Sequence, residues 1–275
     1  MKKIWLGLAV LVLVAIAAYF WLQPAPEQLP PSIPVVSAPA VAPPPPAAPP
    51  EPEIKYTVEP PPGMTELPPL AQAGDFVKER LTELLGIKDV LTFLQLDNFV
   101  HRVVATVDNL PRSLAPPSRW PINPTRGRFT VEAGKDGSVI GAKNAARYAP
   151  FVALVESVDS ERAVALYRRL YPLFQSAYES LGYPGKYFND RLVAVIDLLL
   201  ATPEPTGPLQ VEVPEITGPL KPTRPWLLYQ FSDPALEGLA SGQKILLRVG
   251  SKNEKRLKAK LAEIRKLIVV DKAGG

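Results

Sequence analysis

The chain has 275 residues, 34 prolines, no cysteine and a formal net charge of +4. The absence of cysteine excludes disulfide frameworks, thiol nucleophiles and cysteine metal sites. Because 18 of the prolines lie between Gln23 and Pro69, about 206 residues, 70–275, remain as one globular domain, large enough to fold without cross-links.

The N-terminal residues predict a membrane anchor. After residues 1–3, which contain two lysines, residues 4–22 are nineteen side chains without a charge. A helix of that length is about 28 Å long and spans a bilayer core. The positive-inside rule places residues 1–3 in the cytoplasm and the domain on the other side. The pattern Ala15-Ile16-Ala17 leaves a cleaved signal peptide as an alternative, although the apolar run continues beyond it.

Residues 23–69 predict a disordered, proline-rich spacer. This stretch has no hydrophobic period, and proline restricts both itself and the preceding residue to extended conformations. We therefore expect the spacer to hold the domain at 70–275 away from the membrane.

The first part of the domain predicts helices followed by a β-hairpin. One helix is expected at 74–85, with Gly86 as its C-cap, and a second at 88–108, with Leu91 and Leu94 facing the core. After a proline-rich loop, a hairpin should pair 128–131 with 138–141 around Asp136 and Gly137.

Further helices are expected at 144–158, at 160–181 with Asp159 as N-cap and a kink or break at Pro172, and at 190–201 with Asn189 as N-cap. After a loop at 202–225, a strand at 226–231 and a short helix at Asp233 and Pro234 should follow, then a buried helix or strand at 243–249. Ser251 and Glu254 predict a capping box for a basic helix at 252–269. The fold class is therefore mainly α, with a minor hairpin or small sheet.

Four stretches resemble a known family. They are VDNLPR (107–112), YPLFQSAYESLGYPGKYFNDRLV (171–193), LLATP (199–203) and DPALEGLASGQKILLRVG (233–250). They are similar to the signature stretches of a bacterial family, domain of unknown function 3014. The resemblance covers nearly the whole globular part. It implies a membrane anchor before the domain and supplies no activity.

The sequence favours neither a cofactor nor a metal site. It contains no phosphate loop, dinucleotide fingerprint or HExxH motif. Its one histidine, His101, shares a helix face with Asp97, and a metal site usually needs more ligands than this pair. We expect no cofactor, no metal and no nucleic-acid partner.

Aromatic and charged residues near the helix at 190–201 are the first candidate binding site. Tyr167, Tyr171, Phe174 and Tyr178 form one helix stripe, which is expected to be core, whereas Tyr183 and Tyr187 lie in a loop and are suited to stacking on sugars. Asn189, Asp190 and Arg191 place polar groups at a helix N-terminus, with Asp108 and Arg112 as expected ion-pair partners. The structural interpretation is that these residues cap the helix and form ion pairs. The functional interpretation is that they line a pocket for a peptide or glycan.

The basic last helix is the second candidate. Residues 242–272 hold ten Lys or Arg against three acidic residues, a local charge of +7. Lys255, Lys258 and Lys260 are candidates for binding an anionic partner, while a merely solvated face is the alternative. Its apolar positions, among them Leu257 and Leu261, are equally explained by docking on the domain.

The layout favours a non-enzymatic, single-pass protein of the bacterial inner membrane, whose periplasmic domain binds a protein partner or peptidoglycan. The alternative is a cell-wall hydrolase or transferase that uses Asp190 or Asp108 with a nearby arginine. That chemistry requires two carboxyl groups roughly 5 to 9.5 Å apart in an open cleft.

Overall fold

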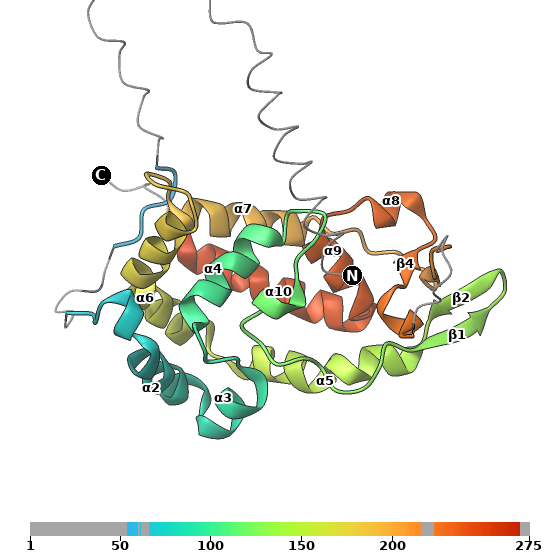
Figure 1. Ribbon diagram of the computed structural model, residues 1–275, viewed down its shortest axis with the longest axis horizontal. Coiled ribbons are helices and arrows are strands. Elements are labelled where there is room, and N and C mark those ends of the chain that lie inside the picture. The colour runs from blue at the N-terminus through green and yellow to red at the C-terminus, as the bar shows by residue number, and fades with distance from the viewer. Residues whose placement is uncertain (1–53, 60, 62–65, 216–222, 270–275) are drawn as a thin grey trace, which may run out of the picture. The chain divides into compact units, whose positions relative to one another are not determined.

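The computed structural model describes residues 54–59, 61, 66–215 and 223–269. This part of the chain is mainly helical, with a small antiparallel sheet at one end (Figure 1). Residues 1–3, the predicted membrane helix at 4–22 and most of the predicted spacer at 23–69 lie outside the described residues. None of the helices that are described is both long and apolar enough to span a bilayer.

The first predicted helix is confirmed as α2 (Gly74–Leu85), which follows the short 3-10 helix η1 (Leu70–Gln72). Gly86 ends α2 with a positive φ of 82°, a conformation that glycine adopts without the strain of a Cβ atom. The sequence at this point therefore predicts both the end of the helix and the residue type that ends it.

The single helix predicted at 88–108 is wrong, because the chain forms α3 (Ile87–Phe93) and α4 (Phe99–Asn109) instead. Between them, Leu94 forms an isolated bridge with Ile122, and Gln95 donates its backbone N–H to the carbonyl of Pro121. The proline-rich segment before residue 124, which includes η2 (Pro117–Arg119), thus takes the backbone groups that would have continued the helix. Leu91, expected in the core, is 60% exposed.

Helices α5 (Ala142–Ser157) and α6 (Ser160–Ser180) confirm the next two predictions. The Asp159 carboxylate accepts the N–H of Arg162 at 2.8 Å, as expected of an N-cap. Pro172 does not split α6, which is one continuous helix.

Helix α7 (Phe188–Leu200) begins earlier than predicted, with Tyr187 in the N-cap position, so the prediction of Asn189 as N-cap is wrong. The C-terminal helices are α8 (Pro234–Glu237), α9 (Ser241–Arg248) and α10 (Ser251–Ile268). The Asp233 cap is confirmed by its bond to the N–H of Ala235 at 2.8 Å. The predicted capping box is wrong, because Gly250 is the N-cap of α10 and makes no side-chain cap bond.

The sheet has four antiparallel strands in the order β1-β2-β3-β4. The predicted hairpin forms, but β1 (Val131–Gly134) starts at the residue where the predicted strand was to end, and it pairs with β2 (Gly137–Ile140). The sequence missed β3 (Gln210–Glu212), which is too short to show an alternating pattern. The strand predicted at 226–231 is reduced to β4 (Gln230–Phe231), preceded by η3 (Pro225–Leu227).

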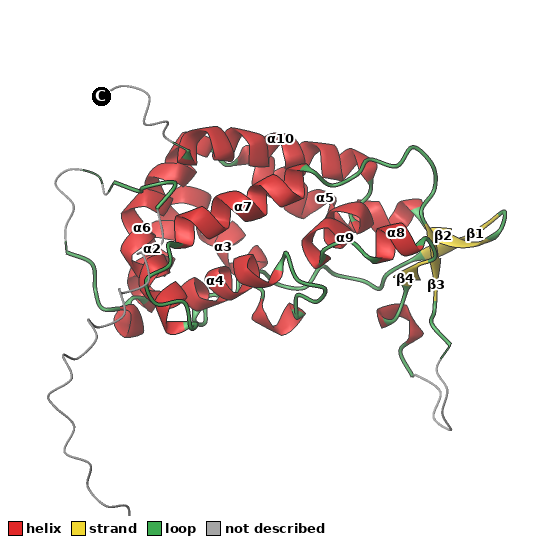
Figure 2. Ribbon diagram, turned by 90° about the horizontal axis from the view of Figure 1, so that it is seen from above, coloured by secondary structure: helices red, strands yellow, loops and turns green. Residues whose placement is uncertain are grey.

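The core lies between helices that are distant in the sequence. Helix α6 contacts α2, α4, α7 and α10, and α10 also packs on α5 and α9 (Figure 2). A second cluster of buried side chains, Val211, Phe231 and Leu247, joins the sheet to α9. The ends of α4, α6 and α7 are therefore held in fixed positions, and the candidate site lies at these ends.

Candidate functional site

Asp108, on α4, gathers several of the predicted site residues around one buried carboxylate. Its side chain is 5% exposed. Its Oδ2 atom accepts hydrogen bonds from Nη2 of Arg112 and, at 3.2 Å, from the Tyr183 hydroxyl. Its Oδ1 atom accepts from Nη2 of Arg191 at 3.1 Å. The ion pair that the sequence predicts between Arg191 and Asp108 is therefore present.

The two arginines bind Asp108 at more than its carboxylate. Nη2 of Arg191 also donates to the Asp108 backbone carbonyl at 2.8 Å. The Arg191 side chain therefore binds both the backbone and the carboxylate of this one residue of α4. The hydrogen bond from Arg112 to Asp108 raises the pKa of the Arg112 guanidinium above its usual value. These bonds fasten the start of α7 to the end of α4, which is a structural role.

The aromatic stripe of α6 is core, as expected. Tyr171, Phe174 and Tyr178 are buried, and burial raises the pKa of the Tyr171 phenol above its usual value. Tyr183 is not a free stacking platform, because its ring lies stacked on Tyr178 at 4.7 Å between centroids. Tyr187 also contacts a core ring, that of Tyr171 at 6.2 Å between centroids, but unlike Tyr183 it lines a pocket.

Asn189 and Asp190 form a clamp for a backbone segment, a role that the sequence did not predict. Asn189 is fully buried; its Nδ2 donates to the Tyr56 carbonyl at 3.1 Å, and its Oδ1 accepts from the Tyr167 hydroxyl. The Asp190 carboxylate accepts the backbone N–H groups of Lys55 and Tyr56, at 3.1 and 2.8 Å. Residues 54–59, which we name the strap, thus lie on the domain although they belong to the predicted spacer.

A pocket of about 280 Å³ opens beside the strap. Its lining residues are Ile54 of the strap, Tyr178, Gly185, Lys186, Tyr187, Asp190 and Arg191. The Lys186 ammonium lies 5.6 Å from the centre of the Tyr183 ring and pairs with no carboxylate in the part of the chain that is described. The pocket therefore offers one unpaired cation and one aromatic face next to the clamp.

The carboxylates named for the enzyme alternative are both engaged. Asp108 is buried against two arginines and a tyrosine, and Asp190 holds two backbone N–H groups of the strap. Neither carboxylate is free to act as an acid, base or nucleophile in this arrangement. No group of three His, Asp or Glu side chains within the described residues is placed to hold a metal ion.

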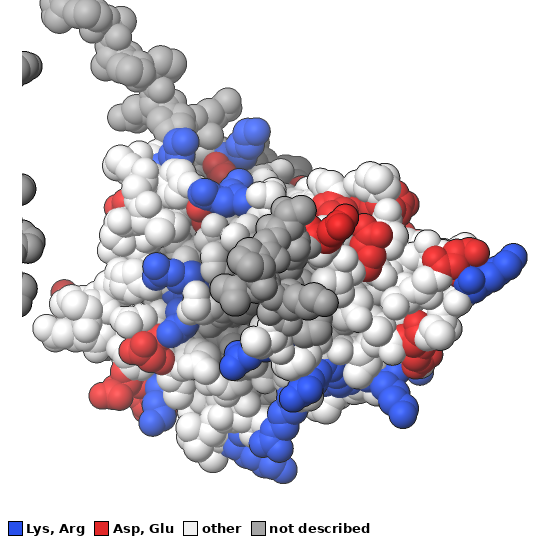
Figure 3. Space-filling view, turned by 45° about the vertical axis from the view of Figure 1, so that its right-hand side comes forward, with Lys and Arg blue, Asp and Glu red and all other residues white. Residues whose placement is uncertain are grey.

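The lysines of α10 are held by the domain to different degrees. Lys258, 11% exposed, donates to the Thr202 carbonyl and to Glu204, and Lys260, 13% exposed, donates to the Val158 carbonyl. Lys255 is 64% exposed. On the face of the molecule that Figure 3 shows, acidic and basic side chains are both present. The contacts of Lys258 and Lys260 favour the docking interpretation of α10, and its apolar positions Leu257 and Leu261 pack on the core.

The buried Glu254 on α10 predicts a pH dependence of stability. Its Oε1 atom has no hydrogen-bond partner among the described residues, and burial raises the pKa of this carboxyl despite Lys258 at 3.6 Å. A raised pKa means that the folded state loses stability as pH rises from the unfolded-state pKa, about 4.3, through the folded-state value. Glu254→Gln should therefore be more stable than the wild type at pH 7, by about 1 kcal/mol.

Urea unfolding at pH 7 and pH 4 measures this difference. At pH 4 the difference between the two proteins should be much smaller, because the wild-type carboxyl is then protonated in the folded state and largely protonated in the unfolded state. The exposed Glu66 has no partner among the described residues, so Glu66→Gln is the control and should change little at either pH. A Glu254→Gln variant that is less stable than the wild type at pH 7 would mean that the Lys258 pairing outweighs burial.

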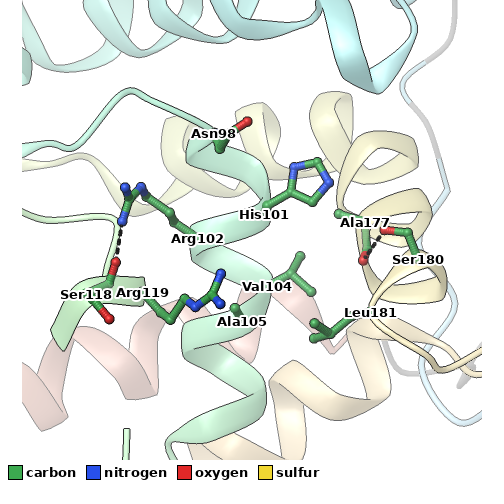
Figure 4. Close-up of a pocket in the computed structure, with 10 residues that line it drawn as sticks. All are labelled: Asn98, His101, Arg102, Val104, Ala105, Ser118, Arg119, Ala177, Ser180 and Leu181. Atoms are coloured by element: carbon green, nitrogen blue, oxygen red, sulfur yellow. Dashed lines mark hydrogen bonds between the residues drawn. The ribbon is translucent and has the colours of Figure 1, made fainter. Parts of the chain in front are cut away.

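A hollow that the sequence did not predict lies on the other side of α4. It measures about 490 Å³ and is bordered by α4, η2 and the end of α6 (Figure 4). His101, dismissed as a metal ligand, and Arg119 are among its lining residues. No sequence pattern marks it, because the elements that border it, α4, η2 and the end of α6, are separated in the sequence.

Comparison with known proteins gives a family and no further relative. The model of the family described as "Protein of unknown function (DUF3014)" matches residues 99–265. No curated protein and no solved structure matches the chain significantly. The matched region contains Asp108, the clamp and every lining residue of the hollow except Asn98, while the strap lies before it.

Proposed function

Because the chain belongs to the DUF3014 family, whose description names no activity, we propose a function from the chain's own layout and contacts. The protein is a non-enzymatic interaction protein of the bacterial cell envelope. Residues 4–22 anchor it in the inner membrane, residues 23–53 act as a spacer, and the domain lies in the periplasm. The two lysines before the apolar run support this orientation.

The pocket beside the strap supports a role in peptide binding. The clamp already binds one backbone segment, the chain's own Lys55 and Tyr56, through the Tyr56 carbonyl as acceptor and two backbone N–H groups as donors. Next to it, the unpaired Lys186 and the ring of Tyr187 line an opening of about 280 Å³. An ammonium beside an aromatic face suits a short peptide that carries a carboxylate.

Two sources of such peptides exist in the envelope, the stem peptides of peptidoglycan and segments of other proteins. A photoreactive benzoylphenylalanine in place of Tyr187 keeps an aromatic ring at the pocket and traps either one in cells. We expect adducts to muropeptides or to one defined protein, and mass spectrometry distinguishes them. The same group in place of Tyr148, on α5, is the positional control.

Charge reversal tests whether the adducts report on the pocket. Lys186→Glu should reduce adduct formation at position 187 several-fold, since it places a negative charge where the ligand carboxylate binds. Lys135→Glu, at the turn of the β1-β2 hairpin, removes the same charge elsewhere and should leave the adducts unchanged. Equal loss with both variants, or equal labelling from positions 187 and 148, would refute peptide binding at this pocket.

Topology is tested separately. A reporter that is active only in the periplasm, fused after Pro69 of the native N-terminal segment, should give signal. Activity of a cytoplasmic reporter at the same junction would reverse the orientation and remove peptidoglycan as a ligand.

A further inference from the structure

The hollow between α4, η2 and the end of α6 is lined by basic, small polar and apolar side chains. Arg102, His101 and Arg119 contribute to its wall, and none of its lining residues is an aspartate or glutamate. Figure 4 shows His101 directed from α4 toward α6, and Arg119 reaching from η2 to the side of α4 next to Ala105. The hollow therefore has a positive electrostatic character that no acidic side chain on its own wall cancels.

The backbone that carries Arg119 is fixed, whereas its guanidinium is free. Arg102 donates from Nη1 to the Ser118 carbonyl at 2.6 Å and from Nε to the Asp97 carbonyl at 2.7 Å. Thr106 donates its hydroxyl to the Arg119 carbonyl at 3.2 Å. In contrast, the side chains of Arg119 and His101 make no hydrogen bond or ion pair with any of the described residues. Arg102 and Thr106 thus position a cation that the domain itself does not use.

The other lining residues are the polar Asn98, Ser118 and Ser180 and four apolar residues, of which Val104 and Ala177 are each only 1% exposed. Val104, Ala105 and Ala177 lie on the facing sides of α4 and α6, and Leu181, 44% exposed, lies just beyond the end of α6. Figure 4 shows Val104 between His101 and Arg119, with Leu181 beside it at the end of α6. A ligand that carries an anionic group close to an aliphatic group can contact Arg119 and Leu181 at once.

We propose that this hollow binds the C-terminal residue of a peptide whose last side chain is aliphatic. In a C-terminal residue, the carboxylate and the side chain leave the same Cα atom, so both reach their partners at once. The Arg119 guanidinium takes the carboxylate as a planar, two-pronged donor. Leu181 and the partly exposed Ala105 contact the aliphatic side chain, and His101 bonds to the preceding amide. The volume of about 490 Å³ is that of a site for a few residues.

This inference goes beyond the proposed function and does not depend on it. The residues that line the hollow differ from those that line the pocket beside the strap. An internal aspartate or glutamate fits less well, because its carboxylate and the nearest aliphatic side chain belong to different residues. The hollow therefore recognises the end of a chain rather than an acidic segment.

Fluorescence anisotropy with the full chain in detergent micelles tests the proposal. The probe is a fluorescein-labelled peptide, Gly-Ser-Gly-Ala-Leu, with a free C-terminus. The same peptide with a C-terminal amide, and the amidated peptide Gly-Ser-Gly-Glu-Leu, are the comparison probes. We expect the free-acid peptide to bind with a Kd below about 1 mM and the two amides to bind roughly tenfold more weakly, as for loss of a charge-assisted pair.

Two variants assign the binding to the hollow. Arg119→Gln should weaken binding of the free-acid peptide roughly tenfold, and Arg126→Gln, which removes an exposed arginine outside the hollow, should leave it within about twofold. Leu181→Glu, at an exposed position, should also weaken it, so the test does not depend on one variant. Melting curves confirm that each variant is folded. Equal binding of acid and amide, binding unaffected by Arg119→Gln, or no binding at millimolar peptide would overturn the proposal.

Discussion

Asp108→Asn is expected to lower the free energy of unfolding by about 3 kcal/mol. The asparagine keeps the size of the side chain but removes the charge that Arg112 and Arg191 share. Arg191 is 30% exposed, so its guanidinium would remain largely desolvated without its counter-ion, and its Nε atom already lacks a hydrogen-bond partner among the described residues. Breaking a buried ion pair usually costs about 3 to 5 kcal/mol. We expect the lower end of this range, because the Arg112 side chain is 52% exposed and water can solvate its guanidinium in the variant.

Thermal and urea unfolding of the two proteins measure this change. For a domain of this size a loss of about 3 kcal/mol corresponds to a fall in Tm of roughly 6 to 12 °C. Asp97→Asn, just before α4, is the matched control. The Asp97 carboxylate also faces an arginine, Arg102 at 3.7 Å, but it is 78% exposed. The control should change stability by less than about 0.5 kcal/mol. A loss for Asp108→Asn no larger than this would show that the cluster does not fasten α4 to α7.

The cluster at Asp108 could be predicted in part because its residues belong to helices with clear boundaries. A carboxylate near the end of α4 and an arginine in the first turn of α7 both lie at helix termini, where ion pairs between neighbouring helices are common. The sequence therefore supported the pairing of Asp108 with Arg191, which the structure contains. It gave no sign that the Tyr183 hydroxyl joins the same carboxylate, because that contact depends on the path of the loop.

The clamp could not be predicted, because its partner is distant in the sequence and looks like spacer. Asn189 has the residue type of an N-cap, and capping was the natural interpretation from local sequence. In the structure the buried Asn189 amide instead donates to a backbone carbonyl of the strap, 133 residues away in the sequence. It makes this bond in place of a capping bond to its own helix. A proline-rich composition describes residues 23–69 as a whole and does not reveal that their end is bound.

The break between α3 and α4 was missed for a related reason. The apolar positions from residue 88 to 108 continue with a helical period, so local sequence favours one helix. The backbone of Leu94 and Gln95 pairs instead with residues 121 and 122, and Asn98 takes a left-handed conformation with a φ of 51°. Tertiary pairing outweighs helix propensity here.

Gly250, at the corner between α9 and α10, should be among the least replaceable residues of the domain. Its φ is 90° and its ψ 145°, a region that residues with a Cβ atom rarely occupy. A Cβ atom at this position would lie 2.7 Å from the Cβ of Ala145 on α5. Asn253 of α10 also contacts α5 at this point, because its Nδ2 donates to the Ala145 carbonyl at 2.9 Å. Helices α5 and α10 therefore cannot separate without losing this bond.

Gly250→Ala is therefore expected to lower the free energy of unfolding by about 4 kcal/mol, from backbone strain and overpacking together. Gly86→Ala, where φ is also positive but the space is open, isolates the strain and should cost about 1 to 2 kcal/mol. Gly74→Ala, with neither strain nor contact, should be neutral or slightly stabilising. Urea unfolding gives the order, and adding Ala145→Gly to Gly250→Ala should recover the part of the loss that comes from overpacking. If Gly250→Ala costs no more than Gly86→Ala, α5 and α10 are not packed as closely as the contact with Ala145 indicates.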